Sequence, residues 1–431
     1  MTDATTSIAS HAQLERAAAE LRTTKAVRER SCQLLARARQ GDSRWFIVDD
    51  GFLDTAANEV LAVTRQRYPR LHIPYHSRWR HFEAGGVDRK SQLDRLLGDL
   101  PAASRAHCMI DLAVISVLLD AGAGPDWKYV EPATGQTYTR SEGLAVASFH
   151  AFTAGLFSSN KDRPLQADAV GLRALVTDHL AAAFQVSQAN PLVGLEGRVI
   201  LLRRLGEALA GQPEVYGQEG RPGGLFDMLI GPLGPDVPPT ADVAAHDILS
   251  QLLMTLSGIW PAGNAIGSVP LGDCWRHSAV RETGQAAVSG GGLTDGWVPF
   301  HKLSQWLTYS LLEPFAWAGV TIRGLDALTA LPEYRNGGLL IDSGLLRLRD
   351  ESATQKVWQP GDEIIVEWRA LTVALLDELA HLVRRQLGLS ESEMPLACVL
   401  EGGTWAAGRA LAQRHRGGLP PLIVASDGTV F

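Results

Sequence analysis

The chain has 431 residues, of which 45% are hydrophobic, and carries a net charge of −7 at neutral pH. This length and composition allow one large or two ordinary domains with a substantial buried core. The negative charge argues against a nucleic-acid partner, because nucleic-acid-binding domains present basic faces. Since the N-terminal sequence lacks a signal-like apolar core and no window approaches roughly 18 apolar residues, we expect a cytoplasmic protein that does not enter a membrane.

The cysteines give little indication of a metal site. There are four, Cys32, Cys108, Cys274 and Cys398, and only Cys274 has a histidine close by, at His277. One such pair is weak evidence for zinc. We therefore expect reduced thiols and no metal or other cofactor.

The first third of the chain is predicted to be helical, with one irregular segment. Helical spacing of Ala, Leu, Arg and Glu predicts one or two helices over Ile8–Arg39, another over Leu53–Arg67, and two within Leu93–Leu119. Trp45–Asp49 is a short apolar run that suits a strand or a helix entry. The Pro- and aromatic-rich segment Tyr68–Phe82 is expected to be irregular, either a surface loop or a lid over a ligand.

Two β-like runs, Trp127–Val130 and Gln136–Tyr138, flank a Pro- and Gly-containing turn and predict a small hairpin. The segment Gly211–Pro239 is rich in Pro and Gly and marks the best candidate boundary. We accordingly divide the chain into an N-terminal helical part (1–210), an excursion (211–240) and a C-terminal helical part (241–431), which we expect to form one integrated unit.

Helical patterns dominate the remaining sequence, and a hairpin around Asp427-Gly428 is expected at the C-terminus. The fold class predicted is therefore mainly α with minor β, without the alternation of a doubly wound sheet. The further predicted helices are Ser141–Phe152, Ala167–Phe184, Leu192–Leu209, Ala241–Leu256, Val298–Leu312, Glu363–Leu387 and Trp405–His415.

Glu333-Tyr334-Arg335 is the strongest candidate for a site. The trio combines a carboxylate, a phenol and a guanidinium immediately before a Gly-Gly step, parts that suit a polar or phosphorylated ligand. An isolated acid–arginine pair is more often a structural salt bridge or a solvated face.

Five longer motifs are spread over nearly the whole chain. They are IPYHSRWRHFEAGGVDR (73–89), IDLAVISVLLDAGAGPDWKY (110–129), VPLGDCWRH (269–277), LPEYRNGGLLIDSG (331–344) and LEGGTWAAGRALAQRHRGGLPPLIVASDGTVF (400–431). In these motifs the chain resembles the uracil catabolism protein four family, also called uracil-regulatable protein three. That resemblance implies a role in a ring-opening route of uracil breakdown through ribosylated urea intermediates.

A more distant resemblance links several of these motifs, in the same order, to the queuosine 5'-phosphate salvage nucleosidases. It implies a compact helical core like that of helix-hairpin-helix DNA glycosylases, and cleavage of an N-glycosidic bond by carboxylates. By position, Glu333 matches that family's catalytic aspartate. The second family acid falls near Tyr309-Ser310 and is absent here, and Glu313, one helical turn further on, is a candidate replacement.

The same resemblance suggests roles for other residues. Asp111 and Glu401 are candidates for orienting sugar hydroxyls or assisting the leaving group, with helix capping or a core salt bridge as the alternative. Tyr334 could donate a hydrogen bond, and Arg335 could fix Glu333 or bind a phosphate. Further candidates are Lys302 and Arg409 for phosphate, Arg78, Arg80 and His81 on a closing loop, Trp405 and Trp79 as aromatic walls, and Asp342 within an apolar frame.

Together the two resemblances imply a hydrolase that converts a ribosylated urea, with or without a 5'-phosphate, to urea and ribose or its phosphate. The alternatives are an amidohydrolase acting on the acyl-urea C–N bond, and a non-catalytic partner or regulator in the same pathway. A small-molecule substrate is expected, and the oligomeric state is left open. The enzyme hypothesis expects Glu333, Tyr334, Arg335, Asp111, Lys302 and Glu401 to converge on one central cavity.

Overall fold

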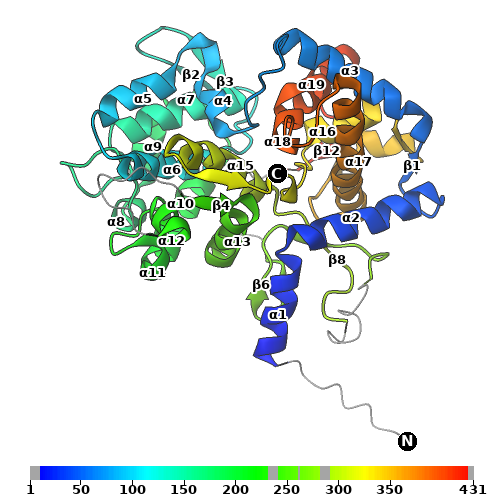
Figure 1. Ribbon diagram of the computed structural model, residues 1–431, viewed down its shortest axis with the longest axis horizontal. Helices are drawn as coiled ribbons and strands as arrows, with labels where there is room; N and C mark the ends of the chain where they lie inside the picture. The colour runs from blue at the N-terminus through cyan, green and yellow to red at the C-terminus, as the bar shows by residue number, and fades with distance from the viewer. Residues whose placement is uncertain (1–9, 232–240, 261–262, 282–291, 426–431) are drawn as a thin grey trace, which may run out of the picture.

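Helices dominate the structure, a computed structural model that describes residues 10–231, 241–260, 263–281 and 292–425 (Figure 1). This confirms the predicted fold class. The helices are α1 (His11–Leu21), α2 (Thr24–Arg39), α3 (Leu53–Arg67), α4 (Arg78–Phe82), α5 (Arg89–Leu97), α6 (Ala102–Leu118), α7 (Arg140–Thr153), α8 (Ala169–Arg173), α9 (Thr177–Ala183), α10 (Leu195–Ala210), α11 (Pro213–Tyr216), α12 (Gly224–Ile230), α13 (Ala245–Leu256), α15 (Lys302–Trp317), α16 (Tyr334–Asp342), α17 (Glu363–Leu387), α18 (Leu396–Val399) and α19 (Trp405–Arg416).

Strands within the described residues form two-stranded pairs, and the predicted hairpin near residues 127–138 is one of them. The antiparallel pairs are β1 (Phe46–Val48) with β10 (Leu346–Leu348), β2 (Lys128–Val130) with β3 (Thr137–Thr139), β5 (Ala265–Ile266) with β6 (Val269–Pro270), and β7 (Cys274–Arg276) with β8 (Trp297–Pro299). The parallel pairs are β4 (Asp242–Ala244) with β9 (Thr321–Arg323), and β11 (Val357–Trp358) with β12 (Ile423–Val424).

Four expectations need correction or lie partly outside the described residues. The segment predicted to be irregular up to Phe82 ends in α4, and the helix predicted from Ala241 begins only at Ala245, after β4. The described arm of the expected C-terminal hairpin, β12, pairs with β11, and its other arm falls within residues 426–431, outside the description. Residues 232–240 of the Pro- and Gly-rich excursion are likewise outside it, while the preceding part contains α11 and α12.

The helices gather in two groups (Figure 1). Helices α5–α12 lie on one side, and α2, α3 and α16–α19 lie on the other. One continuous set of buried apolar side chains, from Leu35 to Leu422, includes residues of both groups. The groups therefore share a core, which fixes their facing surfaces relative to one another. None of the described helices is both long and apolar enough to cross a membrane.

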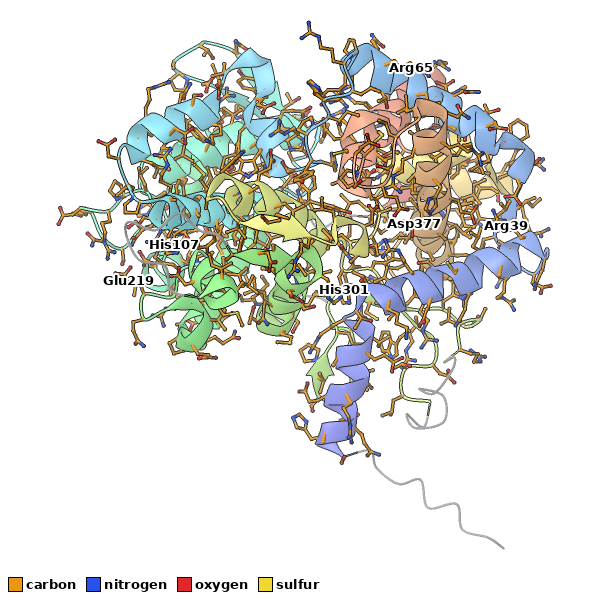
Figure 2. The ribbon with its side chains drawn as sticks, in the orientation of Figure 1. Arg39, Arg65, His107, Glu219, His301 and Asp377 are labelled. Carbon is orange, nitrogen blue, oxygen red and sulfur yellow. The ribbon has the colours of Figure 1, made fainter. Side chains whose placement is uncertain are left out.

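Helix α15 packs against α6 and α13. Almost every side chain from Ser304 to Phe315 is buried, which suits its apolar sequence. Its start is anchored on both sides: the His301 ring lies 2.9 Å from the Leu21 carbonyl oxygen, and Asp273 Oδ2 accepts the Lys302 backbone N–H at 2.9 Å. Figure 2 shows His301 near the end of α1, where these elements meet.

Candidate functional site

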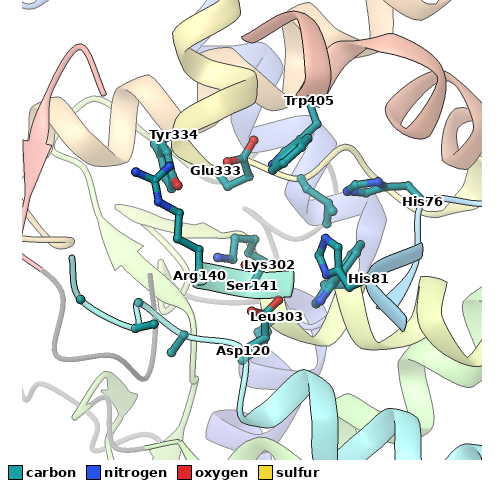
Figure 3. Close-up of a pocket in the computed structure, with 16 residues that line it drawn as sticks. His76, His81, Asp120, Arg140, Ser141, Lys302, Leu303, Glu333, Tyr334 and Trp405 are labelled. Atoms are coloured by element: carbon teal, nitrogen blue, oxygen red, sulfur yellow. The ribbon is translucent and has the colours of Figure 1, made fainter. Parts of the chain in front are cut away.

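A cavity of about 300 Å³ lies where the two helical groups face each other (Figure 3). One wall comes from the loop after α6 and the start of α7, and the opposite wall from the starts of α16 and α19. Its lining residues are His76, His81, Asp120, Ala121, Gly122, Ala123, Gly124, Arg140, Ser141, Lys302, Leu303, Trp306, Leu331, Glu333, Tyr334 and Trp405.

The N-termini of α7, α15 and α16 lie at this cavity. Arg140, Lys302 and Tyr334 are the first residues of α7, α15 and α16, and each lines it. The unpaired backbone N–H groups at a helix N-terminus carry partial positive charge and favour anionic groups. Among the described residues, four non-glycine residues have positive φ, and two of them are Arg140 (φ 54°), which lines the cavity, and His301 (φ 49°), the residue before Lys302. Sparsely populated backbone conformations of this kind concentrate at functional sites.

Glu333 is held rigidly at the N-terminus of α16. Its Oε2 accepts the backbone N–H of Arg335 at 2.7 Å, and its Oε1 accepts that of Asn336 at 2.6 Å. Burial raises the pKa of Glu333, while these hydrogen bonds and the charges of Lys302 and Arg335 oppose the increase. Ser, Thr, Asp and Asn are the usual residues at this capping position. A glutamate that caps a helix and also lines a cavity suits a carboxylate aimed at a ligand.

Lys302 provides a cation next to Glu333. Burial and the charge of Arg369 lower the pKa of Lys302, and the charges of Glu333, Asp273 and Asp120 counteract them. Lys302 is therefore close enough to interact electrostatically with acids on both sides of the cavity. In Figure 3 it lies between Glu333 and Asp120.

Aromatic and histidine side chains form the remaining wall. The rings of His76 and His81 lie 4.7 and 5.8 Å from that of Trp306, and Trp405 completes the surface. Burial and the charge of Arg78 lower the pKa of His81 to about 4. Arg78 Nη1 lies 2.9 Å from His81 Nδ1, and because a guanidinium can only donate, Nδ1 is the acceptor of a neutral ring. This wall therefore adds flat aromatic surface, in which the His81 ring is neutral.

A second cavity, of about 430 Å³, lies on the other side of His76, His81 and Trp405, which line both. Glu401 lines it and accepts hydrogen bonds from Arg67 at 2.7 Å, Tyr68 at 2.9 Å and His76 at 2.8 Å. Burial alone would raise the pKa of Glu401, but the hydrogen bond from His76 and the charges of His76 and Arg67 outweigh it and lower the pKa to about 2.

Arg80 and Arg409 also line this second cavity. Arg80 pairs with Glu313 at 2.7 Å and with Glu83 at 2.9 Å, while Arg409 pairs with Glu142 at 3.2 Å. Glu313 lines neither cavity and also accepts a hydrogen bond from Ser77. It is therefore placed as the structural partner of Arg80, and does not join Glu333 as the second acid.

Asp111 lies outside both cavities, so its predicted convergence with Glu333 is wrong. Its side chain is fully buried, with Oδ2 accepting from Arg221 at 2.7 Å and Oδ1 from the Gly223 backbone N–H at 2.7 Å. These contacts tie α6 to the segment before α12. The core salt bridge, left open as the alternative, is what the structure contains.

Other predicted residues also have structural contacts. Asp342 forms a two-pronged ion pair with Arg416, with both N–O distances 2.6 Å. Arg335 Nη1 donates to the Gly418 carbonyl at 3.0 Å, and its guanidinium stacks on Tyr334 with 4.7 Å to the ring centroid. Trp79 is buried and donates to the Ser310 carbonyl at 3.0 Å. None of these three lines either cavity, which corrects their expected positions.

Five of the predicted residues thus line the first cavity, namely Glu333, Tyr334, Lys302, Trp405 and His81. Sequence reasoning missed Asp120, Arg140 and Trp306. Asp120 carried a usable signal, because it follows a buried apolar helix and precedes the small residues Ala121–Gly124, where a backbone can approach a ligand closely. Among the described residues, no group of three or more His, Cys, Asp or Glu side chains is placed to hold a metal ion.

Comparison with known proteins places the chain in a family. Residues 20–431 match the family model described as a protein of unknown function, DUF1688. The chain belongs to this family. It is 39% identical over 425 residues to Protein urg3 of Schizosaccharomyces pombe, covering 96% of this chain and 98% of that protein. It is 38% identical over 437 residues to Uracil catabolism protein 4 of Lachancea kluyveri, covering 95% and 98%. The predicted family resemblance is confirmed.

Proposed function

We propose that this protein is a hydrolase of uracil breakdown that cleaves the N-glycosidic bond of a ribosylated urea, giving urea and ribose or ribose 5'-phosphate. The observation that carries the proposal is Glu333, fixed by two backbone N–H groups on a cavity that it shares with Lys302. The pathway comes from the relative named Uracil catabolism protein 4, which aligns over nearly its whole length.

Glu333 suits the demands of this reaction. As the bond from the anomeric carbon to nitrogen breaks, its electron pair leaves with the urea nitrogen and the sugar becomes oxocarbenium-like. A negative charge fixed in a poorly solvated cavity stabilises that cation without reorganising. Water then supplies the hydroxyl at the anomeric carbon, and its proton balances the departing urea. Glu333 would orient this water or attack the carbon itself.

The dimensions and charges of the cavity support a small pentoside as substrate. A volume of about 300 Å³ is at the lower end for small-molecule sites. The wall of Trp306 and Trp405 offers flat surfaces for a planar urea group. Arg140 and Lys302, each at a helix N-terminus, are the features that suit a 5'-phosphate. The predicted phosphate ligands Arg335 and Arg409 do not line this cavity.

In a non-catalytic partner, Glu333 would be expected to form a bidentate bridge with an arginine. The hydrogen bonds given for Glu333 instead come from backbone N–H groups, and the residue lines the cavity, which supports the enzyme. The acyl-urea amidohydrolase alternative has no comparable observation in its favour.

The proposal is tested by incubating purified protein with synthetic ribosylurea and with its 5'-phosphate, and measuring the urea released. Comparison with the Glu333→Gln variant ties any activity to this cavity, and Glu351→Gln, at an exposed glutamate elsewhere, is the matched control. We expect urea from at least one compound with wild type and the control, and almost none with Glu333→Gln. Wild-type protein that releases no urea from either compound contradicts the proposal.

A further inference from the structure

Asp120 is a cavity-lining carboxylate with one oxygen unused by the protein. Its side chain is only 10% exposed, and its Oδ2 pairs with Arg78 Nη1 at 2.8 Å. Its Oδ1 is buried and has no hydrogen-bond partner among the residues that the structure describes. Because buried polar atoms are nearly always hydrogen-bonded, an unused oxygen on a carboxylate that lines a cavity indicates that a ligand supplies the donor.

Two fully buried arginines hold this carboxylate and its loop in place. Arg78 binds Asp120 from behind and is itself fixed by a hydrogen bond from Nε to Ser116 Oγ at 2.7 Å. Arg198, from α10, donates to the carbonyl oxygens of Leu119 at 3.1 Å and Ala121 at 2.9 Å. The loop is therefore anchored at both its side chain and its backbone, so Oδ1 is presented in a fixed direction before a ligand arrives.

The charges around Asp120 define the chemistry of that ligand. Asp120 forms an ion pair with Arg78, and a carboxylate in such a pair accepts hydrogen bonds. A phosphate at this position would meet a like charge, and a cationic ligand would meet Lys302, whose pKa responds to both Asp120 and Glu333. A neutral group with O–H donors is repelled neither by Asp120 nor by Lys302.

We propose that Asp120 recognises the sugar of the substrate, with Oδ1 accepting a hydrogen bond from a ring hydroxyl of a pentose. This assignment rests on the proposed function for the identity of the sugar. Asp120 and Glu333 face the same space from opposite sides, with Lys302 between them (Figure 3). Asp120 thus binds the hydroxyl side of the ring while Glu333 faces the anomeric carbon. The substrate class is a ribosyl compound, discriminated from its deoxy analogues.

The test compares ribosylurea with its 2'-deoxy and 3'-deoxy analogues. Wild type is expected to prefer ribosylurea over at least one analogue by about 100-fold or more in kcat/KM, because the site loses a buried hydrogen bond with the deoxy compound. In Asp120→Asn that preference should fall to within about tenfold, through loss of rate on ribosylurea alone. Asp126→Asn, at an exposed acid six residues along, is the matched control and should keep the wild-type preference.

A structural role would lower kcat/KM for all three compounds by the same factor, so an unchanged preference in a folded Asp120→Asn protein overturns the assignment. If that variant does not fold, Asp120→Glu serves instead, because it can keep the ion pair with Arg78 while displacing the accepting oxygen. Calorimetric binding of the three compounds separates this inference from the proposed function. If wild type binds ribosylurea more tightly than its deoxy analogues but releases no urea, the proposed hydrolase activity is contradicted. The assignment of Asp120 is then tested by whether Asp120→Asn loses this difference in binding affinity.

Discussion

The two cavities that share His76, His81 and Trp405 differ in how their acids are partnered. In the larger one, Glu401 is surrounded by donors from Arg67, Tyr68 and His76. In the smaller one, Glu333 is held by backbone N–H groups, and Asp120 keeps an unpartnered oxygen. Both cavities contain acids, cations and the same aromatic wall.

The comparison teaches that the partners of a carboxylate are more informative than the volume beside it. The carboxylate of Glu401 accepts hydrogen bonds from arginine, tyrosine and histidine side chains of the protein itself. These contacts lower the pKa of Glu401. An acid fixed by backbone groups and facing open space keeps its charge available to a ligand. Our proposal therefore places the reaction in the cavity of about 300 Å³ and gives the charges of the cavity of about 430 Å³ a structural role.

The largest expected effect is that of Glu333→Gln on urea release. The change preserves side-chain volume but removes the charge that stabilises the oxocarbenium-like transition state, together with one of the two oxygens that accept backbone N–H groups. The kcat per folded molecule should therefore fall about 100-fold or more. Ground-state affinity for ribosylurea should change little, since binding does not depend on charge that develops later. Steady-state urea release and calorimetric binding measure the two quantities. If Glu333→Gln released urea with the wild-type kcat, the proposed role of the Glu333 charge in the reaction would be contradicted.

The same substitution in the second cavity, Glu401→Gln, should mainly lower the free energy of unfolding. It replaces one acceptor oxygen with a donor amide against Arg67, Tyr68 or His76, so we expect a loss of about 1–3 kcal/mol in the free energy of unfolding at pH 7. Urea release per folded molecule should fall less than about tenfold, far less than in Glu333→Gln. Urea denaturation and activity at matched folded fraction measure these effects. Comparable losses of kcat in the two variants would erase the distinction between the cavities.

The stabilisation by Glu401 should also depend on pH in a defined direction. The folded pKa of about 2 is below the ordinary value of 4.5, so the contribution is fully present above pH 4.5 and is lost as the pH falls towards 2. The difference in unfolding free energy between wild type and Glu401→Gln should therefore be constant from pH 7 to 5.5 and shrink below 4.5. A difference that grows on acidification would contradict the ion-pair origin of the shift.

The sequence predicted the helical fold and the Glu333 side of the cavity because both are local patterns. Glu333 and Tyr334 adjoin in sequence at the start of α16, and Lys302 begins α15, a helix with a clear apolar pattern. The acid on the opposite wall was predicted wrongly: Asp111 was expected there, but Asp120 lines the cavity. Every residue of α6 from Cys108 to Leu118 is buried, so the helix has no amphipathic stripe to show which acid, Asp111 or Asp120, faces a cavity.

Ion-pair partners were the second limit of sequence reasoning. Asp111 is neutralised by Arg221, 110 residues away, and Asp342 by Arg416, 74 residues away. Such pairs depend on how helices pack and leave no periodicity in either local sequence. A family resemblance places a residue in an alignment, but whether its carboxylate is left for a ligand is decided by these distant arginines.

The smallest expected effect is that of Arg409→Ala in the second cavity. Arg409 pairs with Glu142 at 3.2 Å, but the two side chains are 51% and 32% exposed, so solvent screens the pair strongly. Its removal should change the free energy of unfolding by at most about 0.5 kcal/mol. The pair does connect α19 to α7, which carry Trp405 and Arg140 of the first cavity. If Arg409→Ala nevertheless lowered kcat as much as Glu333→Gln should, the ion pair between Arg409 and Glu142 would be setting the distance between the two walls of the first cavity. The second cavity would then have to be counted as part of the active site.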